Sequence, residues 1–301
     1  MAPQRAEVTL FALACVFGFI TLLQVAHAVI ETIRFRSVKP TRPRMRMLAS
    51  AVALFTGHLF AMVTALVALR LDPNSPGVNG TGSGILTTFT IFFQGLAAVL
   101  VFLAVKDAAT ECTHGARNAF IFRKGARWMK WADEALVALW LLIIVAHSVT
   151  LPFINDPLFS NAQDDLAHII SLDCIVDTFG WAFSAVSILA SLSIIASCSA
   201  LYRQLRDAPE GLNRRAVELL TLALCPLLAV QAIAVLVTIV LSKTLSDIVD
   251  LAVVYFIVRS IVDVAIVWVL IFVIRAAHGP RNSRHAKLES ELEGTPLAYG
   301  S

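Results

Sequence analysis

Charged residues are scarce in this chain: they make up 15% of its 301 residues, whereas hydrophobic residues make up 58%. Because an average soluble domain carries about 25% charged residues, most of this chain cannot face water. The five cysteines are scattered, and no two are spaced as Cys-x-x-Cys. The composition therefore excludes an ordinary soluble domain, and the cysteines support neither a disulfide framework nor a metal knuckle.

Sequence motifs of common enzymes are also missing. We find no nucleophile elbow, no P-loop and no two histidines spaced as His-x-x-x-His. We therefore expect a protein that is not an enzyme and that binds no cofactor, no metal and no nucleic acid.

Long apolar runs dominate the sequence instead. A helix needs about 20 apolar residues to cross the roughly 30 Å hydrocarbon core of a bilayer. Seven runs reach that length, at residues 8–30, 47–70, 85–106, 132–152, 172–201, 216–242 and 249–275. They are continuous rather than alternating, which is typical of membrane helices and not of membrane β-strands. The prediction is an all-α, polytopic bundle of seven transmembrane helices over residues 1–275, followed by a disordered polar tail at 276–301.

The positively charged residues predict the orientation of the bundle. Twenty of the 24 Lys and Arg residues fall in the first, third and fifth connections and in the C-terminal tail. Positive charge near helix ends stays on the cytoplasmic side. The N-terminus is therefore expected outside and the C-terminus in the cytosol, in the plasma membrane or an endomembrane. Asn79-Gly80-Thr81 forms a glycosylation sequon in the second connection, which this orientation places outside.

Arg259 and Asp263 interrupt the seventh run, in the stretch VYFIVRSIVDVAIVW. On insertion scales, each charge near the bilayer centre costs about 2.5–3.5 kcal/mol. Two interpretations account for charges placed there. The residues are one helical turn apart, so they can pair with each other and only fix packing. Alternatively, they belong to a larger polar cavity between the helices.

Further polar residues at comparable depth favour the cavity. They come from six of the seven predicted helices and are His58, Gln94, His147, Asp173, Asp177, Gln231 and Tyr255. Polar groups facing lipid are costly, so we expect these side chains to converge on one outward-facing cavity. Asp177 and Arg259 are the predicted pair across it, because a carboxylate facing a guanidinium allows a bidentate interaction. Asp173, Gln94, Gln231, Tyr255 and Asp263 are expected around this pair.

Seven helices with the N-terminus outside resemble the arrangement of G-protein-coupled receptors along the whole chain. Pro226, in LCPLL, is similar to the proline of the sixth receptor helix, and we expect it to kink the helix. The third run ends FLAVKDAAT, without the Asp/Glu-Arg-Tyr triplet of the commonest receptor class, and VVYFIVRS contains no Asn-Pro-x-x-Tyr. Fungal receptor-like and lipid-translocating-exporter-like families are similar in length and topology. No functional residue is carried over from any of these families.

The resemblance and the expected cavity together predict a receptor-like protein that senses a small extracellular or lumenal ligand. The basic cytoplasmic connections are then the expected docking site for a cytosolic signalling protein, while the apolar helix faces contact the lipid bilayer. The alternative is a transporter or channel for a small solute, a lipid or a proton-coupled substrate. In that case the acidic residues would bind a cation or relay protons.

Overall fold

The computed structural model describes the backbone of residues 3–34, 42–70, 79–113, 119–154, 166–207, 213–244 and 248–277. Side chains are described for residues 8–33, 42–69, 85–110, 112, 130–150, 178–206, 213–237 and 253–277. Asn213 is the only described residue that lies outside a helix. The all-α prediction is confirmed.

Seven long helical spans follow one another along the chain. They are α1 (Pro3–Arg34), α2 (Arg42–Arg70), α3 (Asn79–Thr113), α4 (Ala119–Ile154), α6 (Leu166–Asp207), the composite of α7 (Arg214–Glu218), η1 (Leu219–Leu224) and α8 (Cys225–Thr244), and α9 (Ile248–Ala277). Each span contains one predicted run and extends past it. A run defined by hydropathy ends at the first charged residues, whereas the helix continues past them.

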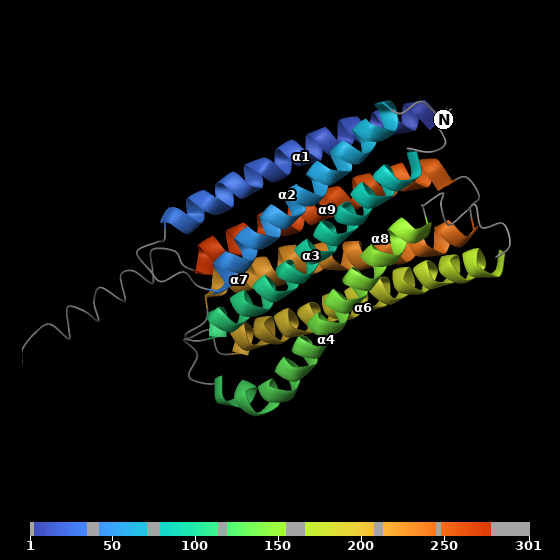
Figure 1. The fold of residues 1–301 in the computed structure, drawn as a ribbon. Helices are drawn as coiled ribbons and strands as arrows, with labels where there is room; N and C mark the ends of the chain where they lie inside the picture. Colours follow the sequence, from blue (N-terminus) through green and yellow to red (C-terminus); the bar gives the residue numbers. More distant parts are fainter. Residues whose placement is uncertain are drawn as a thin grey trace, which may run out of the picture.

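The spans form one closed bundle. Spans that follow each other in the chain pack side by side, and α9 closes the bundle by packing against α1 as well as α8. Helix α3 contacts α2, α4, α6 and α9, so α3 and α9 occupy its centre. Figure 1 shows the long helices running side by side, with α1 at one edge and α4 at the opposite edge.

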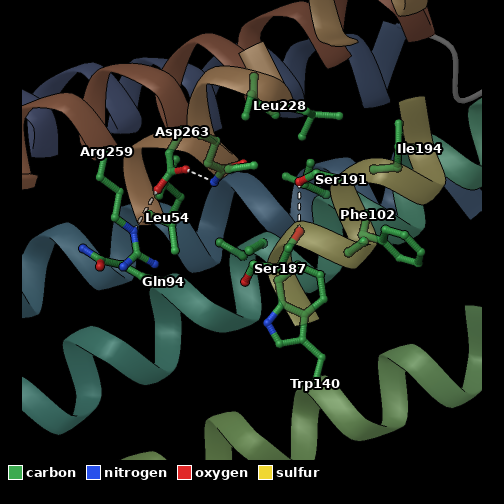
Figure 2. Close-up of a pocket in the computed structure, with 18 of the residues that line it drawn as sticks. Leu54, Gln94, Phe102, Trp140, Ser187, Ser191, Ile194, Leu228, Arg259 and Asp263 are labelled. Carbon is green, nitrogen blue, oxygen red and sulfur yellow. Dashed lines mark hydrogen bonds and ion pairs between the residues drawn. The ribbon is translucent and has the colours of Figure 1, made fainter. Parts of the chain in front are cut away.

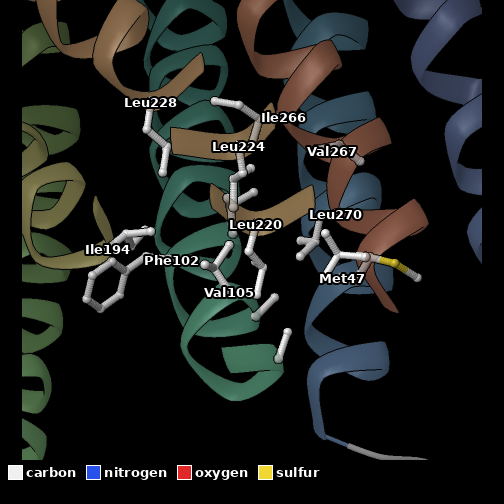
Figure 3. Close-up of a cluster of buried hydrophobic side chains, with 14 of the residues drawn as sticks. Met47, Phe102, Val105, Ile194, Leu220, Leu224, Leu228, Ile266, Val267 and Leu270 are labelled. Atoms are coloured by element: carbon white, nitrogen blue, oxygen red, sulfur yellow. The ribbon is translucent and has the colours of Figure 1, made fainter. Parts of the chain in front are cut away.

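The apolar core is dense where η1 meets α3 and α9. Leu220 and Leu224 of η1 and Leu270 of α9 are completely buried, and Phe102 of α3 is 1% exposed. Figure 3 shows these side chains close together across the three helices. The apolar core therefore joins η1 to α3 and α9.

Large apolar side chains cover the outside of the bundle. Phe19, Leu142, Leu222 and Ile233 are each at least 60% exposed. All seven spans are long and apolar enough to cross a bilayer. Exposed apolar surface on this scale is unfavourable in water and matches a lipid environment. The chain is therefore a multi-pass integral membrane protein whose helices contact the bilayer.

The sixth span changes its winding just before Pro226. The Asn213 side-chain oxygen caps α7 by accepting from the Ala216 N–H at 3.3 Å. The chain then widens into the π-helical η1, where the Cys225 N–H and thiol both donate to the Leu220 carbonyl oxygen, five residues back. A proline offers no N–H to the α-helical ladder, and its ring collides with the preceding turn. The wide turn accommodates both effects, so the interruption expected at Pro226 takes the form of a π-helical segment.

Helices α3 and α4 approach each other closely at Gly95. A Cβ added there would lie 2.9 Å from Ile144 Cγ1 and 3.0 Å from its Cδ1, and Ile144 is itself buried. Gly180 in α6 has no atom within 4 Å of an added Cβ. The first glycine is therefore required by packing, and the second is not.

Substituting these two glycines with alanine is expected to have opposite effects. Gly95→Ala should lower the free energy of unfolding by about 1–3 kcal/mol, because the new methyl group overpacks against Ile144. Gly180→Ala should leave it unchanged or raise it by up to about 1 kcal/mol, because alanine favours the helix and meets open space. Thermal unfolding of the purified variants in nanodiscs measures both. Equal stabilities would show that Ile144 moves aside without cost.

Candidate functional site

A cavity lies in the middle of the bundle. Its walls come from α2, α3, α4, α6, α8 and α9. On α9 the lining runs from Arg259 to Val267, near the centre of that 30-residue helix. The volume of the cavity is about 50 Å³, counted as the space open to the centre of a water-sized sphere, so it holds several water molecules. Figure 2 shows the side chains that line it.

One end of the cavity is polar and is built on α9. Arg259 Nε lies 3.6 Å from Asp263 Oδ2, and the other carboxylate oxygen, Oδ1, accepts from Gln231 Nε2 of α8 at 2.7 Å. Arg259 Nη1 also donates to the Tyr255 hydroxyl at 3.0 Å, and the guanidinium lies over the Tyr255 ring. The Arg259 and Asp263 side chains are only 19% and 14% exposed. The charges therefore face the bundle and are partnered there, as their cost in lipid requires.

Gln94 of α3 lines the same cavity, at 9% exposure. Its Cγ would lie 3.0 Å from a Cβ added at Gly57 of α2, so the absence of a side chain at Gly57 makes room for it. Figure 2 shows Gln94 beside Arg259. The structure thus brings Gln94, Gln231, Arg259 and Asp263 together around one cavity, and Tyr255 contacts Arg259.

The structure has features of both interpretations of Arg259 and Asp263, the pair within one helix and the larger polar cavity. The two residues do form an ion pair within α9, and the pair also joins a polar cluster that reaches α8 and the cavity. The expected partner Asp177 and its neighbour Asp173 lie on the backbone of α6, but their side chains fall outside the described residues. The pairing of Asp177 with Arg259 stays a prediction.

His58 of α2 is buried at 1% exposure but is not among the residues that line the cavity. Its Nδ1 lies 2.9 Å from the Leu54 carbonyl oxygen, and its Nε2 lies 3.2 Å from Ser260 Oγ of α9. Its ring packs against Phe17 of α1 and Phe256 of α9. His58 therefore joins three helices by packing and hydrogen bonds.

His147 and Asn79 lie away from this cavity lining. His147 is two helical turns beyond Trp140 along α4, and its Nδ1 has no hydrogen-bond partner among the described residues. Asn79 is the first residue of α3 rather than part of the connection, and its side chain falls outside the described residues. Glycosylation at Asn79 stays a prediction.

A second, partly buried polar cluster was not predicted from the sequence. Lys106 Nζ of α3 lies 3.0 Å from Asp133 Oδ2 of α4 and donates to Ser193 and Ser197 of α6 at 2.9 and 3.0 Å. Ser193 Oγ in turn donates to Asp133 Oδ1 at 3.1 Å. The hydropathy pattern placed Lys106 at the start of a cytoplasmic connection, but α3 continues to Thr113, and Asp133 and the two serines bind the ammonium group between the helices. The serine pair at positions 193 and 197, one turn apart on α6, was the available signal.

The sequence reasoning also missed Gln24 of α1, which is completely buried. Its Nε2 donates to the Val264 carbonyl oxygen of α9 at 2.7 Å. This bond joins α1 to the part of α9 that carries Asp263. Gln24 is a polar residue inside the first apolar run, so the criterion that singled out Gln94 and Gln231 applies to it as well.

The fold and the cavity together define a class: a seven-helix, multi-pass membrane protein with an internal polar and apolar cavity. The described lining offers hydrogen-bond donors, one ion pair and apolar walls, which is the chemistry of a small-molecule binding site. No protein-family model, no curated protein and no solved structure matches this chain.

Proposed function

We propose that this protein is a receptor-like membrane protein that binds a small molecule in the central cavity and responds by rearranging the ends of its helices. The observation that supports the proposal is the position of the cavity. It joins a buried, partnered ion pair to apolar walls from six spans, so an occupant would touch most of the bundle at once.

The sixth span supplies a route from the cavity to the far end of the bundle. The α8 residues that line the cavity, Leu228, Gln231, Ala232 and Val235, follow η1 directly in the chain. At the other end of the span, the Asn213 amide donates to the Ala276 carbonyl oxygen of α9 at 2.7 Å. Between these two ends lies η1, and π-helical segments inside α-helices are frequent at functional sites. In the predicted orientation, the α7 end faces the cytosol, where a signalling protein would bind.

The transporter alternative is favoured by one observation, the presence of ionisable side chains deep in the membrane. Arg259 and Asp263 sit in the middle of α9, and such residues often mark ion or proton paths. In that version Asp263, together with Asp177, would bind a cation or pass a proton during transport. We propose no enzymatic reaction at this cavity.

A side chain that fills the cavity can stand in for an unknown ligand. We expect Ala232→Phe, which points a ring into the cavity, to change the emission of a fluorophore attached through Arg214→Cys at the exposed start of α7. Ile233→Phe is the matched control, because Ile233 is the next residue and is 60% exposed on the outside of α8. Unmodified protein treated with the same reagent corrects for labelling of the native cysteines.

The same preparation separates the two functions. The receptor proposal expects proteoliposomes under a potassium diffusion potential to show no more proton flux, read by an internal pH dye, than empty liposomes. Proton flux that disappears in Asp177→Asn would overturn the receptor proposal in favour of transport. A fluorophore that responds equally to Ala232→Phe and Ile233→Phe would overturn the link between the cavity and α7.

A further inference from the structure

One buried donor in the cavity has no partner among the described residues. Trp140 of α4 is 4% exposed, lines the cavity, and its indole N–H finds no hydrogen-bond acceptor in the described part of the chain. A buried tryptophan N–H is normally bonded, because leaving such a donor unmatched costs free energy. Figure 2 shows Trp140 extending from α4 toward the other lining residues. The N–H is therefore available to a molecule in the cavity.

The other polar groups near Trp140 are already occupied as donors. The hydroxyls of Ser187 and Ser191 donate to the carbonyl oxygens of Phe183 and Ser187, four residues back on α6, at 2.8 and 2.9 Å. At the far end of the cavity, Gln231 Nε2 donates to Asp263. The Gln94 amide, at the polar end of the cavity, also has no described hydrogen bond. Among the lining donors that are shut off from solvent, the Trp140 indole N–H is the one without an acceptor in the described part of the chain.

The walls around Trp140 are apolar. Its ring packs against Phe102 of α3 and Phe183 of α6, and Ala190 and Leu228 are further apolar residues of the lining. A molecule here would gain most of its binding free energy from burying apolar surface. A single oxygen placed at the indole N–H would then fix its orientation.

The ion pair at the polar end argues against a charged occupant. Arg259 and Asp263 are the charged residues in the described lining, and they balance each other. A ligand with a net charge would add an uncompensated ion to a poorly solvated cavity, which is strongly unfavourable. The cavity volume of about 50 Å³ also limits the occupant to a small molecule.

We infer that the cavity selects a small, uncharged, largely apolar molecule that carries a carbonyl or ether oxygen and accepts a hydrogen bond from the Trp140 indole N–H. This inference rests on the proposed function, since it assigns a ligand class to the same cavity. Its test is nevertheless a binding measurement and does not require a signal at α7.

Two ring compounds of the same shape provide the test. Cyclohexanone and methylenecyclohexane differ mainly in that the first has a carbonyl oxygen where the second has a CH₂ group. The binding of each compound to the protein in nanodiscs is divided by its partition into empty nanodiscs. On this scale, cyclohexanone should bind about five-fold more tightly than methylenecyclohexane, which is the effect of one neutral hydrogen bond. Cyclohexanecarboxylate, which is charged, should bind more weakly than both.

Variants assign the preference to Trp140. Trp140→Phe keeps an aromatic ring, although a smaller one, and loses the indole N–H. The five-fold preference for cyclohexanone should therefore disappear. Trp131→Phe is the control, because Trp131 is on the same helix and 68% exposed, and it should keep the full preference. An indole ¹H–¹⁵N spectrum of the unsubstituted protein gives a second measurement that does not depend on folding of a variant. Cyclohexanone, but not methylenecyclohexane, should shift one indole resonance.

Three results would overturn the inference. The first is equal relative binding of the two ring compounds, which would mean that water satisfies the N–H as well as a ketone does. The second is tighter binding of the carboxylate than of the two uncharged compounds. The third is no binding of either ring compound. A Trp140-dependent preference for the ketone combined with a silent fluorophore at α7 would contradict the receptor proposal alone. A responsive fluorophore without any preference for the ketone would contradict this inference alone.

Discussion

Replacing Asp263 with alanine is expected to lower the free energy of unfolding by about 3–5 kcal/mol, because it leaves the Arg259 guanidinium buried without its counter-ion. Asp263 also accepts the Gln231 hydrogen bond that joins α8 to α9, so the variant loses an interhelical contact at the same time. Unfolding of the purified protein in nanodiscs measures the loss. The size of the effect follows from the low exposure of both charged side chains, 19% and 14%.

Two further variants show whether the cause is the unpaired charge. The double variant Arg259→Met/Asp263→Leu removes both charges and should recover most of the lost stability, since apolar residues of similar volume often replace a buried pair without cost. Glu134→Ala is the matched control on α4, because Lys130 and Glu134 have the same spacing and order of charge but are 77% and 61% exposed. Its effect should not exceed about 0.5 kcal/mol. If Asp263→Ala were as mild as Glu134→Ala, the polar end of the cavity would not depend on this ion pair.

Replacing Lys106 with methionine is expected to have a comparable effect, about 3–5 kcal/mol. Lys106 Nζ uses Asp133, Ser193 and Ser197 as partners, so the ammonium group connects α3, α4 and α6. Without it, the Asp133 carboxylate keeps only the hydrogen bond from Ser193 among the contacts of this cluster. The measurement is again the unfolding of the purified variant in nanodiscs.

The control for this cluster comes from the same helix as Asp133. Lys130→Met removes an exposed ammonium group three residues away and should leave the stability nearly unchanged. Lys106→Met/Asp133→Leu should be more stable than Lys106→Met, because no unpaired charge is left behind. A double variant that is less stable than the single one would indicate that the lost hydrogen bonds, rather than the charge, dominate.

Most of the fold could be predicted from the sequence because the bilayer imposes a length on each helix. The run 249–275 covers almost all of α9, and the run 85–106 covers the middle of α3. The ends were harder to place, since hydropathy treats Lys106 and Arg46 as boundaries. In the structure both residues lie inside helices and have partners on neighbouring helices: Asp133 for Lys106, and Asp107 for Arg46 at 2.8 Å. Such partners come from other helices and are invisible in a local pattern.

The candidate site could be predicted only in part, for a related reason. Depth along the helices grouped Gln94, Gln231, Arg259 and Asp263, and in the structure these four residues line one cavity, because residues at one level of a bundle lie within reach of each other. Depth does not give the rotation of each helix. His58, at a similar level, contacts Phe17 and Ser260, whereas Trp140, which was not singled out within the run 132–152, lines the cavity.

The π-helical segment η1 has a consequence for the geometry of the cavity. A wide turn holds one more residue than an α-helical turn would need, so everything beyond it is rotated by about 100° relative to an uninterrupted α-helix. Gln231 lies beyond η1 and reaches Asp263 at 2.7 Å. The extra residue therefore determines the rotation of α8 about its axis. In a regular α-helix the Gln231 amide would face a different neighbour, and the Asp263 carboxylate would lose this hydrogen bond.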